Sequence, residues 1–278
     1  MRDKKGYIYS STELSRYYGI SIKGMAFYEE KNLIHPERVG TGMTRRFNLK
    51  DCYRLASARM LHNCGFSLDE TAMMLRDNTA DVMAAHLDGR AEQLEREIRL
   101  QQGILSGVRR IEQMIRQVQQ GETQPELTTM PAVRWLFIRR LNDAHTSTPE
   151  ETNEFCHWNS MMPITEASLH IPLHTLIGET ERMDTEIGMM IREEDFLNYG
   201  FEESGRITRV EQCPAIHGFI CCDELELDQK RCLAEILQFA AANGLCPSGD
   251  SYSRLIFSLR EKGKNIRWDE FWMPVVQP

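Results

Sequence analysis

A glutamate stands between two tryptophans near the C-terminal end of the chain, in the run Trp268 to Met273. If this run is a β-strand, alternation places Trp268, Glu270 and Trp272 on one face. A carboxylate among aromatic rings is costly to desolvate and attracts a cation, and each ring face adds about 0.5–2 kcal/mol. The pattern therefore predicts a site for a bulky lipophilic cation. The alternative is that Glu270 pairs with Arg267 or another surface arginine at a sheet edge while the tryptophans belong to the core.

Other aromatic side chains could complete such a pocket. They occur in the first strand, the first helix and the penultimate strand expected for the C-terminal part. With the three residues above, the ligand-site candidates are Trp135, Phe137, Phe155, Trp158, Tyr252, Trp268, Glu270 and Trp272. The chain also has 15 methionines, whose flexible side chains repack around ligands of different shape. Each such residue, taken alone, is more often core than ligand contact.

The remaining reactive side chains form no pattern typical of catalysis or metal binding. The 8 cysteines are scattered, without a C-x-x-C pair or a paired Cys/His spacing, which favours reduced structural thiols. The 8 histidines are dispersed, and the sequence lacks G-x-S-x-G, a P-loop and H-E-x-x-H. We therefore expect no enzyme activity, no bound metal and no cofactor.

Charge is divided unevenly along the chain, although the net charge is only −8. Residues 1–62 have 12 Lys and Arg against 6 Asp and Glu, whereas residues 121–278 have 14 against 26. A basic N-terminal part is expected to bind a polyanion, because Lys and Arg near phosphates release counterions. The alternative is an ordinary uneven surface. No apolar run reaches roughly 18–20 residues and the N-terminus is polar, so we expect a cytoplasmic protein without membrane contact.

The basic part is predicted to contain short helices and one hairpin. The expected helices cover residues 10–18, 22–31, 49–64 and 68–76. Gly19 separates the first two, which is the helix-turn-helix pattern. Pro36 ends this pair, and Gly40 to Phe47 form a glycine-turned hairpin with an arginine pair, which is typical of a wing.

Residues 81–119 contain no proline and are predicted to form one long helix. Apolar residues recur in sevens, as Leu87, Leu94, Val108 and Ile115, with a second row at Ala91, Ile98 and Leu105. The interruptions include Gly103 and Gly107. Such a helix is about 58 Å long, far more than its small N-terminal domain could cover. We expect an antiparallel coiled coil between two copies of the chain, since symmetric homodimers are the commonest oligomers. The alternative is packing against its own C-terminal domain.

Beyond a polar linker, residues 121–131, the pattern changes to strands mixed with helices. The expected strands cover residues 133–139, 167–176, 185–191, 207–211, 215–221, 251–259 and 267–273, and the expected helices 149–162 and 227–243. The order of strand pair, helix and strand pair occurs twice. This indicates a duplicated α+β unit and an α+β fold class for the whole chain.

Residues 7–75 resemble the MerR family of transcription regulators. The matching segments are Tyr9, Glu13-Leu14-Ser15, Gly19-Ile20-Ser21, Met25-Ala26-Phe27-Tyr28-Glu29, Leu33-Ile34-His35-Pro36 and Gly65-Phe66-Ser67-Leu68-Asp69-Glu70. The resemblance implies a winged helix-turn-helix that binds DNA, followed by a long dimerisation helix.

Two departures from the family pattern bear on DNA recognition. The family's threonine and arginine in T-L-R-Y-Y-E are Gly24 and Ala26 here, and its wing pattern G-Y-R-x-Y is Met43 to Phe47. Other side chains must therefore contact DNA, and the candidates are Arg16, Lys23, Phe27, Tyr28, Arg45 and Arg46. Metal-sensing members place a cysteine at the start of the long helix. This chain has Asp77 to Asp81 there, which disfavours metal sensing.

Residues 127–278 resemble the GyrI-like effector-binding domain of MerR regulators of the BmrR-like, multidrug-sensing type. The resemblance rests on the duplicated layout, on Asp250-Ser251-Tyr252 opening a strand, and on Asp269 to Pro274, where a glutamate lies four residues before the proline. It implies that a small lipophilic, cationic ligand binds near Glu270 and Tyr252.

The two resemblances together imply a ligand-responsive regulator that binds promoter DNA as a homodimer. It would bend and untwist an overlong promoter spacer so that RNA polymerase engages both promoter elements. The DNA-binding domain would cover residues 1–77, the dimerisation helix 78–120, and the linker with the effector domain 121–278. The alternative is that the C-terminal domain recognises a protein partner instead of a small molecule.

Overall fold

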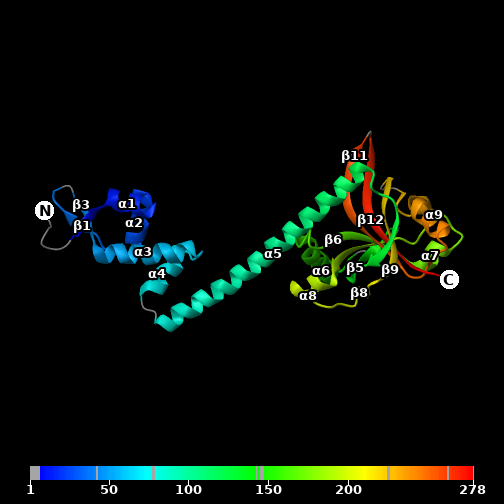
Figure 1. Cartoon of the computed structure of the whole chain (residues 1–278). Helices are drawn as coiled ribbons and strands as arrows, with labels where there is room; N and C mark the ends of the chain where they lie inside the picture. The colour runs from blue at the N-terminus through cyan, green and yellow to red at the C-terminus, as the bar shows by residue number, and fades with distance from the viewer. Residues whose placement is uncertain are drawn as a thin grey trace. The chain divides into compact units, whose positions relative to one another are not determined.

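The computed structural model describes residues 7–41, 43–76, 79–141, 143–144, 147–223, 226–261 and 263–277. The chain divides into two compact units, residues 1–97 and 98–278 (Figure 1). The expected domain boundary between residues 77 and 78, and Gly42 of the expected wing turn, lie outside the described residues. Within the described ranges, no helix combines the length and apolarity needed to cross a bilayer.

The first unit contains short helices and a small antiparallel sheet. Its elements are β1 (Tyr7–Ser10), α1 (Ser11–Tyr18), α2 (Ile22–Glu30), β2 (Glu37–Val39), β3 (Thr44–Asn48), α3 (Leu49–Asn63), α4 (Leu68–Arg76) and the start of α5 (Ala80–Gln120). The strands lie in the order β1-β3-β2. The four expected short helices are confirmed to within one residue at each end. Strand β1 was not predicted.

Local side chains explain where these helices begin and end. Ser10 and Glu13 form a reciprocal capping box at the start of α1, and the Ser21 hydroxyl accepts a hydrogen bond from the Gly24 N–H at the start of α2. Gly19 ends α1 at φ 60°, a left-handed conformation that glycine adopts without steric cost. The core beneath is formed by Leu14, Ile20, Met25, Tyr28, Leu33, Ile34, Phe47, Cys52, Leu55, Ala58 and Ala72.

The second unit is a mixed helix and sheet domain. Its elements are the second half of α5, β4 (Glu126–Met130), β5 (Val133–Arg140), α6 (Pro149–Ser160), β6 (Glu166–Ile171), α7 (Leu173–Ile177), β7 (Glu186–Arg192), α8 (Glu193–Asn198), β8 (Ile207–Val210), β9 (Cys213–Asp223), the 3-10 helix η2 (Lys230–Leu233), α9 (Ala234–Ala242), β10 (Cys246–Pro247), β11 (Ser251–Glu261) and β12 (Lys264–Val276). In the described residues they build one sheet in the order β4-β9-β12-β11-β6-β7-β5-β8, and β10 pairs with β12.

The strand order contains the internal repeat that the sequence pattern predicted. The elements β5, α6, β6 and β7 form a β-α-β-β unit with the sheet order β5-β7-β6. The elements β9, α9, β11 and β12 repeat it with the order β9-β12-β11. Strands β6 and β11, which are the second strands of their units, pair antiparallel and join the two halves.

Several expected elements differ in extent, and three of them differ in kind as well. The strand over 167–176 ends at Ile171, because Pro172 fixes its own φ at −60° and starts helix α7. The helix over 227–243 is shorter and consists of η2 and α9. The expected linker 121–131 contains strand β4, which pairs with β9. Because β9 lies far along the chain, the local sequence of the linker does not predict this pairing.

The two faces of the sheet are covered by different helices. On one face, α9 packs on Ile216 and Phe271, and α6 packs on Leu136. On the other face, the second half of α5 packs on Phe219 and Ile256. The side chains of α5 that make this contact are Ile111, Met114, Ile115 and Val118.

The two glycines that interrupt the heptads of α5 lie in close contact with the second unit. A Cβ at Gly103 would collide with the side chains of Tyr199 and Ile164, and one at Gly107 would stand 2.7 Å from the Pro163 carbonyl oxygen. At Gly107 the obstacle is backbone, so a glycine is needed for the helix to approach this closely. Close packing against its own domain therefore accounts for both glycines.

The middle of the heptad side of α5 remains open to solvent, whereas Leu87 and Ile115 at its two ends pack in the first and the second unit. Ile98, Leu105 and Val108 are 55%, 49% and 51% exposed. The expected alternative, packing against the chain's own domain, thus holds for one side of the helix. The coiled coil with a second copy stays a prediction for the other side.

Candidate functional site

The sheet face beneath α5 carries the predicted carboxylate. Alternation along β12 is confirmed, because Phe271 and Met273 pack under α9 whereas Trp268, Glu270 and Trp272 belong to the opposite face. Trp272 lies in a buried cluster with Trp135 and Tyr252, which has Phe137 at its border. The ring centroids of Trp135 and Tyr252 are 6.0 Å apart.

Three ligand-site candidates lie away from this aromatic cluster. Trp268 packs against Phe257 in the cluster under α5. Phe155 and Trp158 lie with α6 on the opposite face of the sheet. They belong to the core there, because α6 turns its apolar side to the sheet, so they do not line the face that carries Glu270.

Glu270 is buried but its charge is paired. The side chain is 7% exposed, its Oε2 accepts a hydrogen bond from Arg254 Nε, and its Oε1 lies 2.8 Å from His217 Nε2. Arg267, named beforehand as an alternative partner, instead binds Asp269 at 2.7 and 2.9 Å. The alternative is thus correct that an arginine pairs with Glu270, but wrong about its place, because Arg254 is buried on the interior strand β11 and is not a surface residue at a sheet edge.

A second buried carboxylate, Glu166, shares the same arginine. Its Oε2 is 3.2 Å from Arg254 Nη1, and its Oε1 accepts hydrogen bonds from Arg110 Nε and Nη2 at 3.0 and 2.7 Å. Arg254 is 7% exposed, and its Cζ lies 5.0 Å from the centre of the Trp272 ring. A chain of ion pairs therefore leads from α5 across β6 and β11 to β12.

His217 on β9 continues this chain, and the pKa values of His217 and Glu270 are both shifted. Burial lowers the pKa of His217, but the hydrogen bonds and charges of Glu270 and Glu126 raise it by more, so the net pKa lies above its usual value. Burial raises the pKa of Glu270, but the hydrogen bond from His217 and the charge of Arg254 bring it below its usual value. Both shifts favour an ionised pair.

The hollow beside Arg254 is small. It measures about 10 Å³ and is lined by Met130, Pro131, Val133, Glu166, Met190, Ile191, Arg192, Arg254 and Trp272. This is room for about one water molecule. A drug-sized ligand fits in this hollow only if side chains move.

A larger, open hollow of about 680 Å³ lies beside α6. Its acidic lining consists of Glu150, Glu151, Glu154, Glu202 and Glu203. Arg206 lies among these residues, 3.6 Å from Glu154 and 3.8 Å from Glu151. These carboxylates form a second group that could attract a cation, separate from Glu166 and Glu270.

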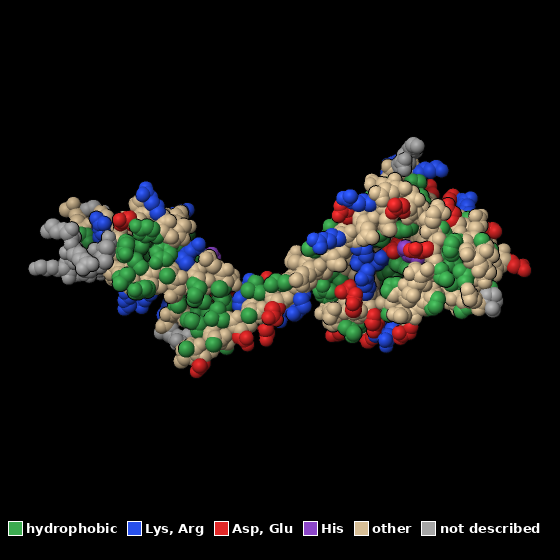
Figure 2. All heavy atoms as spheres, in the orientation of Figure 1, with side chains coloured by type: hydrophobic (Ala, Val, Ile, Leu, Met, Phe, Trp, Pro, Cys, Tyr) green, Lys and Arg blue, Asp and Glu red, His purple; other side chains and the backbone are tan. Residues whose placement is uncertain are grey.

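In the first unit, most of the expected DNA contacts are exposed. Arg16, Lys23, Phe27 and Arg46 lie at the surface. Arg45 is partly covered, and its Nε lies 2.8 Å from Glu29. Figure 2 shows Lys and Arg side chains beside exposed hydrophobic ones on this unit.

Tyr28 is placed differently from what the sequence suggested. It is 4% exposed inside the core, so it has no surface to offer to DNA and leaves the candidate set. Tyr17 on α1, by contrast, is 71% exposed.

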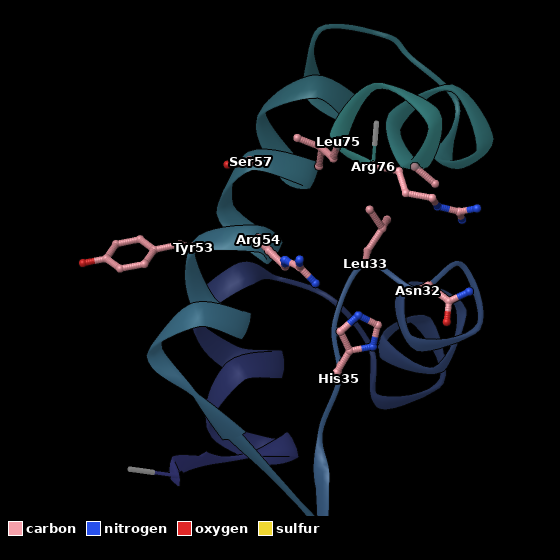
Figure 3. Close-up of a pocket in the computed structure, with 9 residues that line it drawn as sticks. Asn32, Leu33, His35, Tyr53, Arg54, Ser57, Leu75 and Arg76 are labelled. Carbon is pink, nitrogen blue, oxygen red and sulfur yellow. The ribbon is translucent and has the colours of Figure 1, made fainter. Parts of the chain in front are cut away.

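The first unit also contains a basic hollow of about 460 Å³ (Figure 3). It is lined by Asn32, Leu33, His35, Tyr53, Arg54, Ser57, Ala72, Leu75 and Arg76. In Figure 3 the side chains of His35 and Arg54 point into the space between α3 and the segment after α2, and Tyr53 points away. None of the expected DNA contacts lines this hollow.

Comparison with known families decides what the first unit is. Residues 9–78 match the family described as MerR HTH family regulatory protein. The N-terminal domain is a MerR-family domain. In this MerR-family domain, α1 and α2 are the two helices of the helix-turn-helix, and β2 pairs with β3 at the hairpin that the sequence predicted as a wing.

Several solved structures are similar to parts or all of the chain. A cryo-EM structure of an EcmrR–DNA complex in EcmrR-RPo has 13% identity, covers 97% of this chain and 100% of that chain, and has a TM-score of 0.37. The N-terminus of MtaN, the Bacillus subtilis multidrug transporter activator, has 24% identity over 41% of this chain and 97% of that chain, with a TM-score of 0.29. A hydrolase from Listeria innocua has 12% identity over 55% and 92%, with a TM-score of 0.35. Similarities at this level assign no function. No curated protein matches the chain.

Outside the MerR-family domain, sequence reasoning missed the partners of Glu270. Arg254 lies 16 residues and His217 53 residues from Glu270, and Glu166 lies 88 residues from Arg254. The position of Arg254 inside the expected strand 251–259, beside apolar residues, is the local signal that could have indicated a buried ion pair, since an unpaired buried arginine is costly.

Proposed function

We propose that this chain is a ligand-responsive transcription regulator that binds promoter DNA in the cytoplasm and has no catalytic role. The proposal rests first on the MerR-family domain at residues 9–78. Lys23 and Phe27 are exposed on α2 and Arg46 on the wing. In winged helix-turn-helix domains the second helix enters the major groove, while flanking side chains bind phosphates and fix the register.

The protein acts as a homodimer in this proposal. Ile98, Leu105 and Val108 are apolar, exposed and spaced by seven and three residues along α5. A second copy of the same helix, running antiparallel, covers these side chains. Two MerR-family domains are then available for the two halves of a palindromic operator.

The second unit is the effector-binding domain, which we propose to be GyrI-like. The repeated β-α-β-β order supports this, as does the cluster of Trp135, Tyr252 and Trp272 beside buried carboxylates. A lipophilic cation gains from the indole and phenol faces and from the negative charge of Glu270. Met130 and Met190 in the same cluster supply adaptable apolar surface.

Ligand binding is coupled to transcription through the shape of the DNA. The liganded dimer bends and untwists an overlong promoter spacer so that RNA polymerase engages both promoter elements. A nearly complete switch requires that the ligand favour the activating state by roughly 5.5 kcal/mol.

Transcription in vitro tests this proposal. The operator is first selected from random duplex DNA with the purified chain, placed in a promoter spacer, and transcribed with and without tetraphenylphosphonium. We expect output to rise with the cation and to stay unchanged with the neutral analogue tetraphenylmethane. Unchanged output at saturating cation would reject this inducer class.

One observation favours a second candidate, in which the C-terminal domain binds a protein partner. The hollow at Arg254 measures only about 10 Å³, which suits a closed domain that presents its outer surface. Tryptophan fluorescence separates the two functions, since two of the 4 tryptophans, Trp135 and Trp272, lie in the aromatic cluster on the sheet face of Glu270. An aromatic cation that binds there quenches them, and Glu270→Ala weakens cations more than neutral analogues of the same shape. Equal loss for both would favour the protein-interaction module.

A further inference from the structure

Glu166 and Glu270 use their two carboxylate oxygens in the same way. In each, Oε2 accepts a hydrogen bond from Arg254. The Oε1 of Glu166 accepts from Arg110, and the Oε1 of Glu270 is hydrogen-bonded to His217. The guanidinium of Arg254 is thus the central cation between two buried carboxylates.

The surroundings of this guanidinium are those of an occupied cation site. Its Cζ lies 5.0 Å from the Trp272 ring centre, a cation–π distance. The cluster that contains Trp272 also contains Trp135 and Tyr252. The adjoining hollow of about 10 Å³ leaves no room for a second organic cation beside Arg254.

We propose that Arg254 is a built-in occupant of the cation site, and that the ligand is a flat amidinium or guanidinium with an aromatic body that takes its place between Glu166 and Glu270. This inference rests on the proposed sensing function and names its ligand class. A planar cation with several N–H donors reproduces the fork of Arg254, which a phosphonium without N–H groups does not. Its aromatic body replaces the contact of Arg254 with Trp272.

The exchange leaves neither carboxylate without a protein partner. Glu166 keeps two hydrogen bonds from Arg110, and Glu270 keeps His217. Removing one partner from a buried ion pair is costly mainly when the remaining charge is left alone. Glu166 therefore contacts both the exchanged cation and Arg110 of α5, so the exchange occurs next to the long helix.

Binding of 4-phenylbenzamidine to the full chain, measured by calorimetry, tests the exchange. If Arg254 competes with the ligand, Arg254→Leu binds the amidine about tenfold more tightly, because the ligand no longer displaces an internal cation. Arg254→Lys keeps a cation and gains nothing. The neutral 4-phenylbenzamide gains nothing in any variant.

Arg134 provides a matched control in the same unit. It is equally buried, its Nε lies 2.6 Å from Glu193, and its Cζ lies 4.9 Å from the Phe196 ring centre. Arg134→Leu removes the same kind of contact on the opposite face and leaves amidine affinity unchanged. An equal gain in Arg134→Leu and Arg254→Leu, or no gain in Arg254→Leu, overturns the proposal.

The unmodified chain provides a second measurement in case Arg254→Leu fails to fold. The Nε–H of Arg254 is buried on Glu270, so its NMR signal exchanges slowly with solvent and is assigned by its loss in Arg254→Lys. Saturating 4-phenylbenzamidine releases this proton to fast exchange, and 4-phenylbenzamide does not. A signal that stays protected at saturation overturns the proposal.

These outcomes separate the inference from the proposed function. If tetraphenylphosphonium activates transcription while Arg254→Leu shows no gain for the amidine, the sensing function stands and the role of Arg254 is wrong. If neither cation binds the unmodified chain or Arg254→Leu, both fail.

Discussion

Arg110 of helix α5 and Glu166 of strand β6 are joined by two hydrogen bonds, at 3.0 and 2.7 Å. The pair is nearly buried, with side-chain exposures of 16% and 8%. Arg110 also donates to the Pro163 carbonyl oxygen at 3.2 Å. This arginine therefore fastens the long helix to the second unit at the point where the buried charges begin.

Removing this arginine should destabilise the second unit. We expect Arg110→Gln to lower the free energy of unfolding by about 1.5–3 kcal/mol, because Glu166 loses two charge-assisted hydrogen bonds and keeps Arg254 as its partner. The matched control is Arg116→Gln, since Arg116 pairs with Glu112 on the exposed side of the same helix and such pairs contribute about 0.3–0.5 kcal/mol. Urea unfolding measures both, and equal losses would contradict a structural role for Arg110.

Stability should depend on pH through His217. Its folded pKa lies above the usual 6.5, so its contribution is fully present below about pH 6.5 and is lost as pH rises through the folded pKa. The free energy of unfolding of the unmodified chain should therefore fall more steeply than that of His217→Gln above this pH. Urea unfolding between about pH 5.5 and 8.5 measures the difference. Parallel curves for the two proteins would show that the pKa of His217 is the same in the folded and the unfolded state.

Two glycines of α5 should respond in opposite directions to alanine. Gly107→Ala forces a Cβ to within 2.7 Å of the Pro163 backbone, so we expect a loss of about 1–3 kcal/mol. Gly89→Ala meets no atom within 4 Å and should gain about 0.5–1 kcal/mol from helix propensity. Thermal unfolding compares them, and a stabilised Gly107→Ala would mean that α5 lifts off the domain.

Phosphate and groove contacts should reside on the exposed basic residues of the MerR-family domain. We expect Lys23→Ala and Arg46→Ala each to weaken operator binding and to reduce the slope of log affinity against log salt by about 1. Arg182→Ala, which changes an exposed arginine of the second unit, should leave both quantities unchanged. Fluorescence anisotropy over a salt series is the measurement. An unaltered slope in both Lys23→Ala and Arg46→Ala would show that these two residues do not contact DNA phosphates.

The heptad side of α5 should determine the oligomeric state. We expect Leu105→Glu to convert the proposed dimer into monomers, because a charge then faces the seam of the proposed coiled coil. Leu259→Glu is the control, since Leu259 is 59% exposed on β11 and belongs to neither row of heptad residues. Sedimentation equilibrium distinguishes the two, and a monomeric unmodified chain would refute the coiled coil.

The sequence by itself determined the elements and the first domain's family. Helix ends follow from contacts between near neighbours, such as Ser10 with Glu13, and strand faces follow from alternation, as for Trp268, Glu270 and Trp272. These are local rules, so a single sequence carries them. The same rules misjudged Tyr28, because a helical pattern does not say which of two adjacent aromatic residues lies inside.

Only the tertiary structure decided how the predicted carboxylate is used. Which cation pairs with Glu270 depends on the order of strands in the sheet, which places Arg254 and His217 on either side of β12. The fate of α5 likewise depends on a close approach of Gly103 and Gly107 to a distant loop. Pairing between residues far apart in the chain is fixed by sheet topology and close packing, and neither leaves a periodic signal in the sequence.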